Sequence, residues 1–161
     1  MNLLESFEVD AHVDRVALAL CSEAFNLAAE KEREEVVATR YVVLEQNDAG
    51  LQFEVRSTEY KRTKTGRLDK SGTVQSMIHN RYRARDMTLA WDYKGVGSRW
   101  VTISGVYRLT PDGGRTRVVH DITIDVHIPL IGGKIARYIA GEFKTAAGRF
   151  ERLLKLHTSD A

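Results

Sequence analysis

The sequence is poor in three features that would narrow its function at once: cysteine, net charge and long apolar runs. Its single cysteine, Cys21, excludes an internal disulfide and a metal site built from several cysteines. The formal net charge of +2 argues against a general polyanion binder, although a local basic patch remains compatible with it. No apolar run approaches the roughly 18 residues that span a bilayer. We therefore expect a soluble cytoplasmic protein without a transmembrane segment.

The motifs of common catalytic and cofactor sites are missing as well. The five histidines form no HxH, HExxH or Cys/His cluster, so no metal site is predicted. No G-x-S-x-G motif is present, and Cys21 has no evident base beside it, which argues against nucleophilic catalysis. The glycine pairs at 95 and 97 and at 132 and 133 lack the context of a phosphate loop or a dinucleotide fold. We predict no metal and no cofactor.

Length and composition predict one domain, residues 1–161. With 161 residues and 43% hydrophobic content, the chain is long and apolar enough to form a core of its own. The first ten residues, M-N-L-L-E-S-F-E-V-D, lack a basic start followed by an apolar run, so no signal peptide is predicted.

The N-terminal part predicts a short strand and two short helices. Alternation over 3–10 is typical of a strand, with its apolar side ending at Val9. Asp10 is a suitable N-cap for the first helix, and Ser22 is one for a second helix over 23–31. The mixed charges of 30–35 predict a solvated helix end.

From residue 36 the apolar period changes to two, which predicts six antiparallel strands. We expect them at about residues 36–45, 51–60, 73–82, 87–93, 101–109 and 115–127. Turn chemistry at 47–50 and at 111–114 joins two of the pairs. In the strand 73–82 the pattern leaves the inward-facing phase open.

The C-terminal segment predicts one long amphipathic helix. The preceding strand stops near Pro129, and the chain crosses Gly132 and Gly133 before the helical period begins. At about 100° per residue, one apolar arc contains Ile135, Ile139, Phe143, Ala146, Phe150, Leu153, Leu154 and His157. Glu142 is placed at the edge of this arc, so it is the one acid expected near the buried face.

Two stretches resemble the START-related helix-grip superfamily (SRPBCC, polyketide cyclase-like). The opening F-E-V-D-A-H-V-D-R-V, residues 7–16, resembles the strand-to-helix entry of that superfamily. The run V-H-I-P-L-I-G-G-K-I-A-R-Y-I-A, residues 126–140, is similar to the ending of a bacterial subfamily of unknown function. The resemblance implies an α+β helix-grip fold. In this fold a curled seven-stranded antiparallel sheet holds the long helix across its concave face, with a hydrophobic-ligand cavity between them. Neither motif is catalytic, so the resemblance implies no reaction.

His120 and Glu142 are the residues most suited to chemistry. His120 shares a strand face with Ile122 and Ile124, which places its imidazole inside, where it could contact a ligand carbonyl or act as acid or base. The alternative is a core histidine satisfied by one side chain or by water. Glu142 would reach the same cavity from the helix, or else form a salt bridge or lie exposed at the rim.

The remaining candidates are inward-facing side chains that could line the cavity or simply form the core. The catalytic candidates are His120, Glu142 and Tyr107. The candidate ligand-binding residues are Phe53, Val55, Trp91, Tyr93, Tyr107, His120, Ile122, Ile139, Glu142 and Phe143.

A basic stretch, 61–70, has no aromatic residue for stacking on bases, so we interpret it as a solvated hairpin loop and expect no nucleic acid partner.

Three kinds of function stay open. The first is non-enzymatic binding of a lipid-like or polyketide-like molecule between the sheet and the C-terminal helix. The second is a cyclase, aromatase or dehydratase that positions a flexible substrate with few acids or bases. The third is an interaction module, with a homodimer or another protein as its partner.

Overall fold

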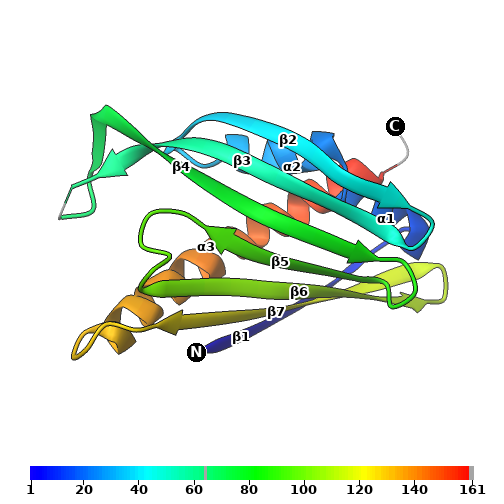
Figure 1. Ribbon diagram of the computed structural model, residues 1–161. Helices are drawn as coiled ribbons and strands as arrows, with labels where there is room; N and C mark the ends of the chain where they lie inside the picture. Colours follow the sequence, from blue (N-terminus) through cyan, green and yellow to red (C-terminus); the bar gives the residue numbers. More distant parts are fainter. Residues whose placement is uncertain (64, 160–161) are drawn as a thin grey trace.

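The structure is a computed structural model that describes residues 1–63 and 65–159. Its strands form one antiparallel seven-stranded sheet in the order β1-β7-β6-β5-β4-β3-β2 (Figure 1). Along the chain the elements are β1 (Asn2–Val9), α1 (Val13–Leu20), α2 (Glu23–Lys31), β2 (Val36–Asn47), β3 (Gly50–Arg62), β4 (Leu68–Arg83), β5 (Thr88–Lys94), β6 (Val101–Asp112), β7 (Arg115–Val126) and α3 (Gly132–Thr158). The predicted order of strand, two short helices, six strands and long helix is confirmed.

The three helices cover one face of the sheet, and α3 is the longest of them (Figure 1). The backbone of α3 approaches β1 and β7 as well as α1 and α2. Among the described residues it makes no comparable approach to β3, β4 or β5. Large side chains therefore have to bridge the distance between α3 and the middle of the sheet.

The predicted apolar arc of α3 is confirmed by its burial. Leu153 and Leu154 are buried, and Phe143 and Phe150 pack against the core while staying partly exposed. The largest fully buried side chains of the core are Phe25, Phe53, Leu20, Ile122, Ile124 and Leu154. They come from both the helices and the sheet, as expected for a sheet covered on one face.

Two local predictions are corrected by the backbone. His12, rather than Asp10, is the N-cap of α1, and its Nδ1 accepts a hydrogen bond from the Asp14 N–H. Pro111 lies inside β6 instead of in the turn, because the hairpin closes through Gly113 and Gly114 alone. Both glycines have positive φ, 54° and 87°, which a two-residue turn needs if its twist is to match the strands.

Half of the predicted basic loop is strand, at 61–62 and 68–70. β3 continues to Arg62 and β4 begins at Leu68, so only a short connection remains between them. Lys64 of the predicted loop lies outside the described residues.

On β4, the side chains of Ser76, Ile78 and Asn80 point to the inner face of the sheet. Ser76 and Asn80 are buried, and Asn80 pairs with Trp91 of β5 and Phe53 of β3 in one inward-facing row. The apolar alternation did not reveal this phase because two of the inward-facing side chains are polar.

Three residues of the charged run 30–35, Glu30, Arg33 and Glu35, join a partly buried network, whereas Lys31, Glu32 and Glu34 are exposed as the predicted solvated helix end requires. The Arg33 guanidinium donates to Glu30 at 2.8 Å, to Glu35 at 3.0 Å and to Glu59 at 2.7 Å. Ser57 donates to Glu30, and Ser76 donates to Glu59. Burial by itself would lower the pKa of Arg33, but the three carboxylates raise it above its usual range. The network fastens the end of α2 to the inner face of β3 and β4.

Candidate functional site

His120 lies on the inner face of β7, as the alternation predicts, and it is only 6% exposed. Its Nε2 accepts a hydrogen bond from Trp91 Nε1 at 3.0 Å. The Tyr107 ring stacks on the imidazole, with ring centroids 3.7 Å apart. Phe150 of α3 stacks against both rings, with centroids 5.2 Å from Tyr107 and 6.3 Å from His120, so the aromatic side chains bridge the sheet and the helix.

A glycine makes the contact between Trp91 and His120 possible. Trp91 of β5 pairs with Gly105 of β6, and its indole has to cross β6 to reach His120 on β7. A Cβ at Gly105 would lie 2.6 Å from indole atoms, closer than carbon atoms approach each other in proteins. Gly105 is therefore required for the indole to lie across β6.

The hydrogen bond from Trp91 fixes the protonation pattern of His120. Because Nε2 is an acceptor, the neutral imidazole carries its proton on Nδ1. Burial lowers the pKa of His120 to about 3, so the ring is neutral at physiological pH. His120 can then offer one N–H donor to a ligand. At physiological pH it carries no second proton that it could give up as a general acid.

Glu5 is the carboxylate that lies next to this histidine. Strand register puts Tyr107, His120 and Glu5 in one row across β6, β7 and β1. Glu5 Oε2 is 4.0 Å from His120 Nδ1, which is too long for a direct hydrogen bond. Burial raises the pKa of Glu5, and the nearby Lys144 partly opposes that rise. Burial, with Glu5 adding to it, raises the pKa of Tyr107 well above its usual value.

Glu5, Tyr107 and His120 form what we call the polar row. It combines a carboxylate that can accept a proton with two neutral groups that can donate hydrogen bonds. This set can hold a polar group of a ligand or polarise a carbonyl.

Of the two alternatives for Glu142, exposure at the rim is the one that the structure shows, so this acid does not reach the inner face. Glu142 is exposed, while its neighbour Phe143 faces inward and packs near Trp91 with ring centroids 6.0 Å apart. At the helical period, the two neighbours point about 100° apart. Glu5 was the acid to expect inside, since it shares the alternating face of Leu3 and Phe7.

The other predicted ligand-binding residues all face inward, but they differ in accessibility. Phe53, Val55 and Ile122 are almost fully buried and form the core behind the inner surface. Tyr93, Ile139 and Phe143 stay partly exposed although they pack against the core. Side chains of this second kind are the most open to a ligand, whereas Trp91 (7% exposed), Tyr107 (8%) and His120 (6%) expose little surface.

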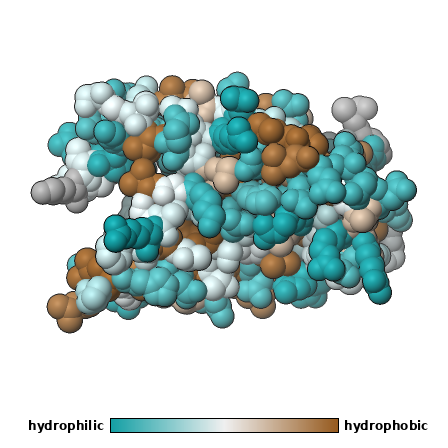
Figure 2. Space-filling model, in the orientation of Figure 1, coloured by the Kyte–Doolittle hydropathy of each residue, from teal (hydrophilic) through white to brown (hydrophobic). Residues whose placement is uncertain are grey.

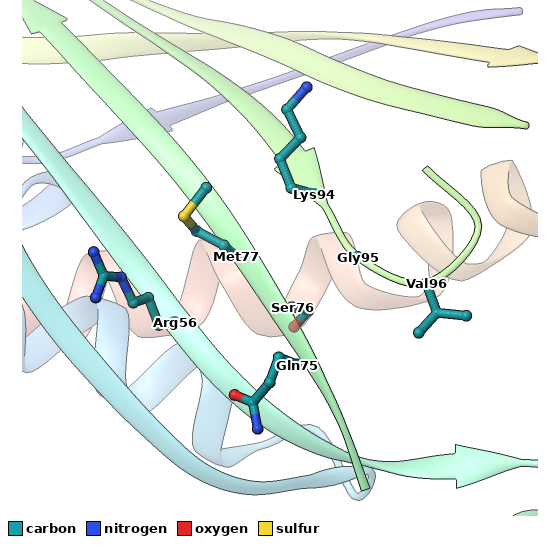
Figure 3. Close-up of a pocket in the computed structure, with 7 residues that line it drawn as sticks. All are labelled: Arg56, Gln75, Ser76, Met77, Lys94, Gly95 and Val96. Carbon is teal, nitrogen blue, oxygen red and sulfur yellow. The ribbon is translucent and has the colours of Figure 1, made fainter. Parts of the chain in front are cut away.

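A hollow of about 420 Å³ opens beside β4 (Figure 3). Its lining consists of Arg56, Gln75, Ser76, Met77, Lys94, Gly95 and Val96. It lies where β5 ends, since Met77 and Lys94 are the last residues paired between β4 and β5. Arg56, Met77 and Lys94 are cross-strand partners on the outer face of the sheet, and Ser76 is a lining residue that faces inward. A second hollow, of about 240 Å³, lies around Arg81, Asp92 and Asp121.

Within residues 1–63 and 65–159, no group of three or more His, Cys, Asp or Glu side chains is arranged to hold a metal ion. In the same residues, no helix has the length and apolar character needed to cross a membrane.

A family model for proteins of unknown function, DUF2505, matches residues 5–155. The chain belongs to this family. The match spans every strand and helix described above, from β1 into α3.

Solved structures with the fold of this DUF2505 chain come from several kinds of protein. A START superfamily protein from Mycobacterium smegmatis has a TM-score of 0.61 at 14% identity, with 96% of this chain and 98% of that one covered. The Zhui aromatase/cyclase from Streptomyces sp. R1128 has a TM-score of 0.60 at 15% identity, covering 98% and 93%. Norcoclaurine synthase from Thalictrum flavum, in complex with dopamine and hydroxybenzaldehyde, has a TM-score of 0.60 at 10% identity, covering 99% and 89%. No curated protein matches the sequence.

At these identities the likeness is one of fold. The resemblance to START-related helix-grip proteins is confirmed, and the DUF2505 chain shares their curled sheet and long C-terminal helix.

The contact across Gly105 gives a first prediction. Gly105→Ala should push the indole of Trp91 away from His120 and lower the free energy of unfolding by about 1–3 kcal/mol, because the added methyl group overpacks the core. Urea unfolding measures the loss, and the indole N–H resonance of Trp91 reports the broken hydrogen bond. Gly141→Ala is the control, because a Cβ there meets nothing within 4 Å and alanine favours a helix. An unchanged indole resonance in Gly105→Ala would contradict the geometry.

The lowered pKa of His120 gives a second prediction. The pKa of His120 is about 6.5 in the unfolded chain and about 3 in the folded chain. Between these two pH values, His120 is protonated in the unfolded chain and neutral in the folded chain. The contribution of His120 to stability is therefore complete above pH 6.5 and is lost at about 1.4 kcal/mol per pH unit as the pH falls toward 3. The difference in free energy of unfolding between wild type and His120→Gln should shrink accordingly. A difference that stays constant with pH in urea titrations would show that His120 is not held neutral.

Proposed function

We propose that this domain binds a small, largely apolar molecule between α3 and the central strands. The proposal rests on side chains that point to the inner face of the sheet and still stay partly exposed. Tyr93, Ile103, Ile139 and Phe143 all face inward and all stay partly exposed. The backbone of α3 stands farther from β3, β4 and β5 than from β1 and β7, so these side chains are the proposed contact surface beneath it.

The chemistry of this space suits a molecule with one polar group. Apolar burial would supply the main driving force, at roughly 25 cal/mol per Å² of apolar surface removed from water. The polar row lies at one side of the space, with Tyr107 and the Nδ1–H of His120 as donors and Glu5 as acceptor. A carbonyl or hydroxyl group fits this set of donors and acceptors.

The hollow beside β4 is the proposed way in. Its lining includes Ser76 and Gly95. A Cβ at Gly95 would lie 2.3 Å from the Tyr93 hydroxyl, so the hollow is next to Tyr93 of the inner surface. The relatives support a small-molecule role, because a norcoclaurine synthase of the same fold is seen with dopamine and hydroxybenzaldehyde.

Filling the inner space should abolish binding. Ile139→Trp places a large ring in it, and we expect at least a tenfold rise in the Kd of the apolar dye anilinonaphthalene sulfonate, measured by fluorescence titration. Ile139→Ala leaves the space open and should keep the wild-type Kd within a few-fold. Tyr138→Trp is the matched control, since Tyr138 is 62% exposed on the neighbouring position of α3. Equal Kd values for Ile139→Trp and Tyr138→Trp would contradict a site beneath α3, as would a wild type that binds no dye.

The polar row supports one alternative, an enzyme that acts on an enolisable carbonyl compound. Burial raises the pKa of Glu5, which makes the carboxylate a better proton acceptor. Glu5 would take the proton from the carbon next to the carbonyl, and that electron pair would move toward the carbonyl oxygen. Tyr107 O–H and His120 Nδ1–H would donate hydrogen bonds to this oxygen as it gains charge.

Deuterium exchange tests the alternative without knowledge of the natural substrate. If it holds, the protein should accelerate exchange of the α-protons of a long-chain methyl ketone in D₂O, followed by NMR. Glu5→Gln should lose the acceleration at an unchanged Tm. Glu8→Gln, an exposed acid on the same strand, should retain it. A wild type no faster than buffer would remove the enzymatic alternative and leave binding alone.

A further inference from the structure

One end of the molecule exposes a group of large apolar side chains. The connections 95–100 and 127–131 are adjacent there, since the His127 N–H donates to the Trp100 carbonyl at 2.7 Å. We call this surface the apolar end, and it consists of Val96 (72% exposed), Trp100 (48%), Leu130 (105%) and Ile131 (51%). In Figure 2 hydrophobic atoms protrude at the lower left, where Figure 1 has the turn into α3.

Leu130 is the most unusual of these residues. Its side chain is fully exposed, and its φ of 69° lies in the left-handed region that glycine and asparagine adopt more readily than leucine. Leucine therefore gains nothing from the core here and is disfavoured by its own backbone. The fold gives no reason for a leucine at this position, which points to a contact outside the chain.

Basic side chains surround the apolar end. Lys94, Arg99, Lys134 and Arg137 are all exposed, and the Arg99 guanidinium lies over the Trp100 ring at 5.3 Å. Neither 93–107 nor 126–141 contains an acidic residue. The N-terminus of α3 adds the partial positive charge of its free N–H groups. Lys94 also has the Asp92 carboxylate 4.0 Å from its Nζ, and the surface as a whole combines exposed apolar side chains with an excess of positive charge.

We propose that the apolar end docks on an anionic phospholipid bilayer. An aromatic ring, aliphatic tips and surrounding cations are the combination that favours the interface of such a membrane. Leu130 and Ile131 would enter the headgroup region, and the four cations would contact lipid phosphates. A protein partner would be expected to match the cations with a defined set of carboxylates, whereas an anionic lipid surface matches them in any arrangement.

Docking would bring the hollow beside β4 close to the membrane. Lys94 and Val96 line the hollow of about 420 Å³ and also belong to the basic and apolar parts of this surface. A docked molecule would hold the opening next to the lipid. The docking proposal does not depend on the proposed ligand, because it rests on the outer surface alone.

Co-sedimentation with vesicles tests the proposal. Wild type should bind vesicles of phosphatidylcholine and phosphatidylglycerol in equal amounts, bind phosphatidylcholine alone far more weakly, and lose affinity with added salt. Leu130→Asn should weaken binding at least about tenfold, since it removes an inserted apolar side chain. It should not lower the Tm, because asparagine suits the left-handed backbone. The double variant Arg99→Glu, Lys134→Glu should weaken binding by more than about 25-fold, at about fivefold or more per charge.

Leu156→Asn is the matched control. Leu156 is also an exposed leucine, at 65%, but it lies near the far end of α3, so this variant should bind vesicles as wild type does. Absence of binding to the mixed vesicles, or equal losses in Leu130→Asn and Leu156→Asn, would overturn the proposal. A wild type that dimerises in solution, becomes monomeric in Leu130→Asn and ignores vesicles would assign the surface to a second copy of the chain instead. Dye binding in Leu130→Asn, measured in parallel, separates failure of docking from failure of the inner site.

Discussion

The hydrogen bond from Trp91 to His120 is the interaction on which the interior of this protein depends. It joins two polar atoms that are both buried, and leaving either of them without a partner would cost about 1–3 kcal/mol. It also determines which nitrogen of His120 carries the proton. Gly105 is the structural condition for it, because any side chain there would occupy the place of the indole. The single donor that the histidine can offer a ligand follows from this one contact.

The inner face of the sheet is bounded by charge on two sides. The polar row lies along β6, β7 and β1, while the network of Arg33 with Glu30, Glu35 and Glu59 lies against β3 and β4. Between them the inward-facing side chains are mostly apolar or aromatic, with Asn80 as a buried polar one. This arrangement is suited to a ligand with an apolar body, and the buried carboxylates would disfavour an anionic group near the Arg33 network.

Two features depart from the usual pattern in which charged side chains are exposed and large apolar side chains are buried. Glu30 and Glu59 are buried, while Leu130 is fully exposed on a strained backbone. Each departure costs free energy unless something compensates for it. Arg33 and two serines compensate for the carboxylates within the fold. Nothing in the described residues compensates for Leu130, which is why a contact outside the chain is assigned to it.

The sequence by itself determined the order of the elements, the inward face of β7 with His120 on it, and the apolar arc of α3. Each of these depends on local periodicity, which a single strand or helix carries alone. The tertiary structure decided which side chains meet. Glu5 reaches His120 because the first strand pairs with the last, and Trp91 reaches it only across Gly105. The phase of β4 and the ion pair of Arg33 with Glu59 depend in the same way on polar side chains that find partners far along the chain. Register between distant strands is set by the assembled core, so no local pattern could place these residues together.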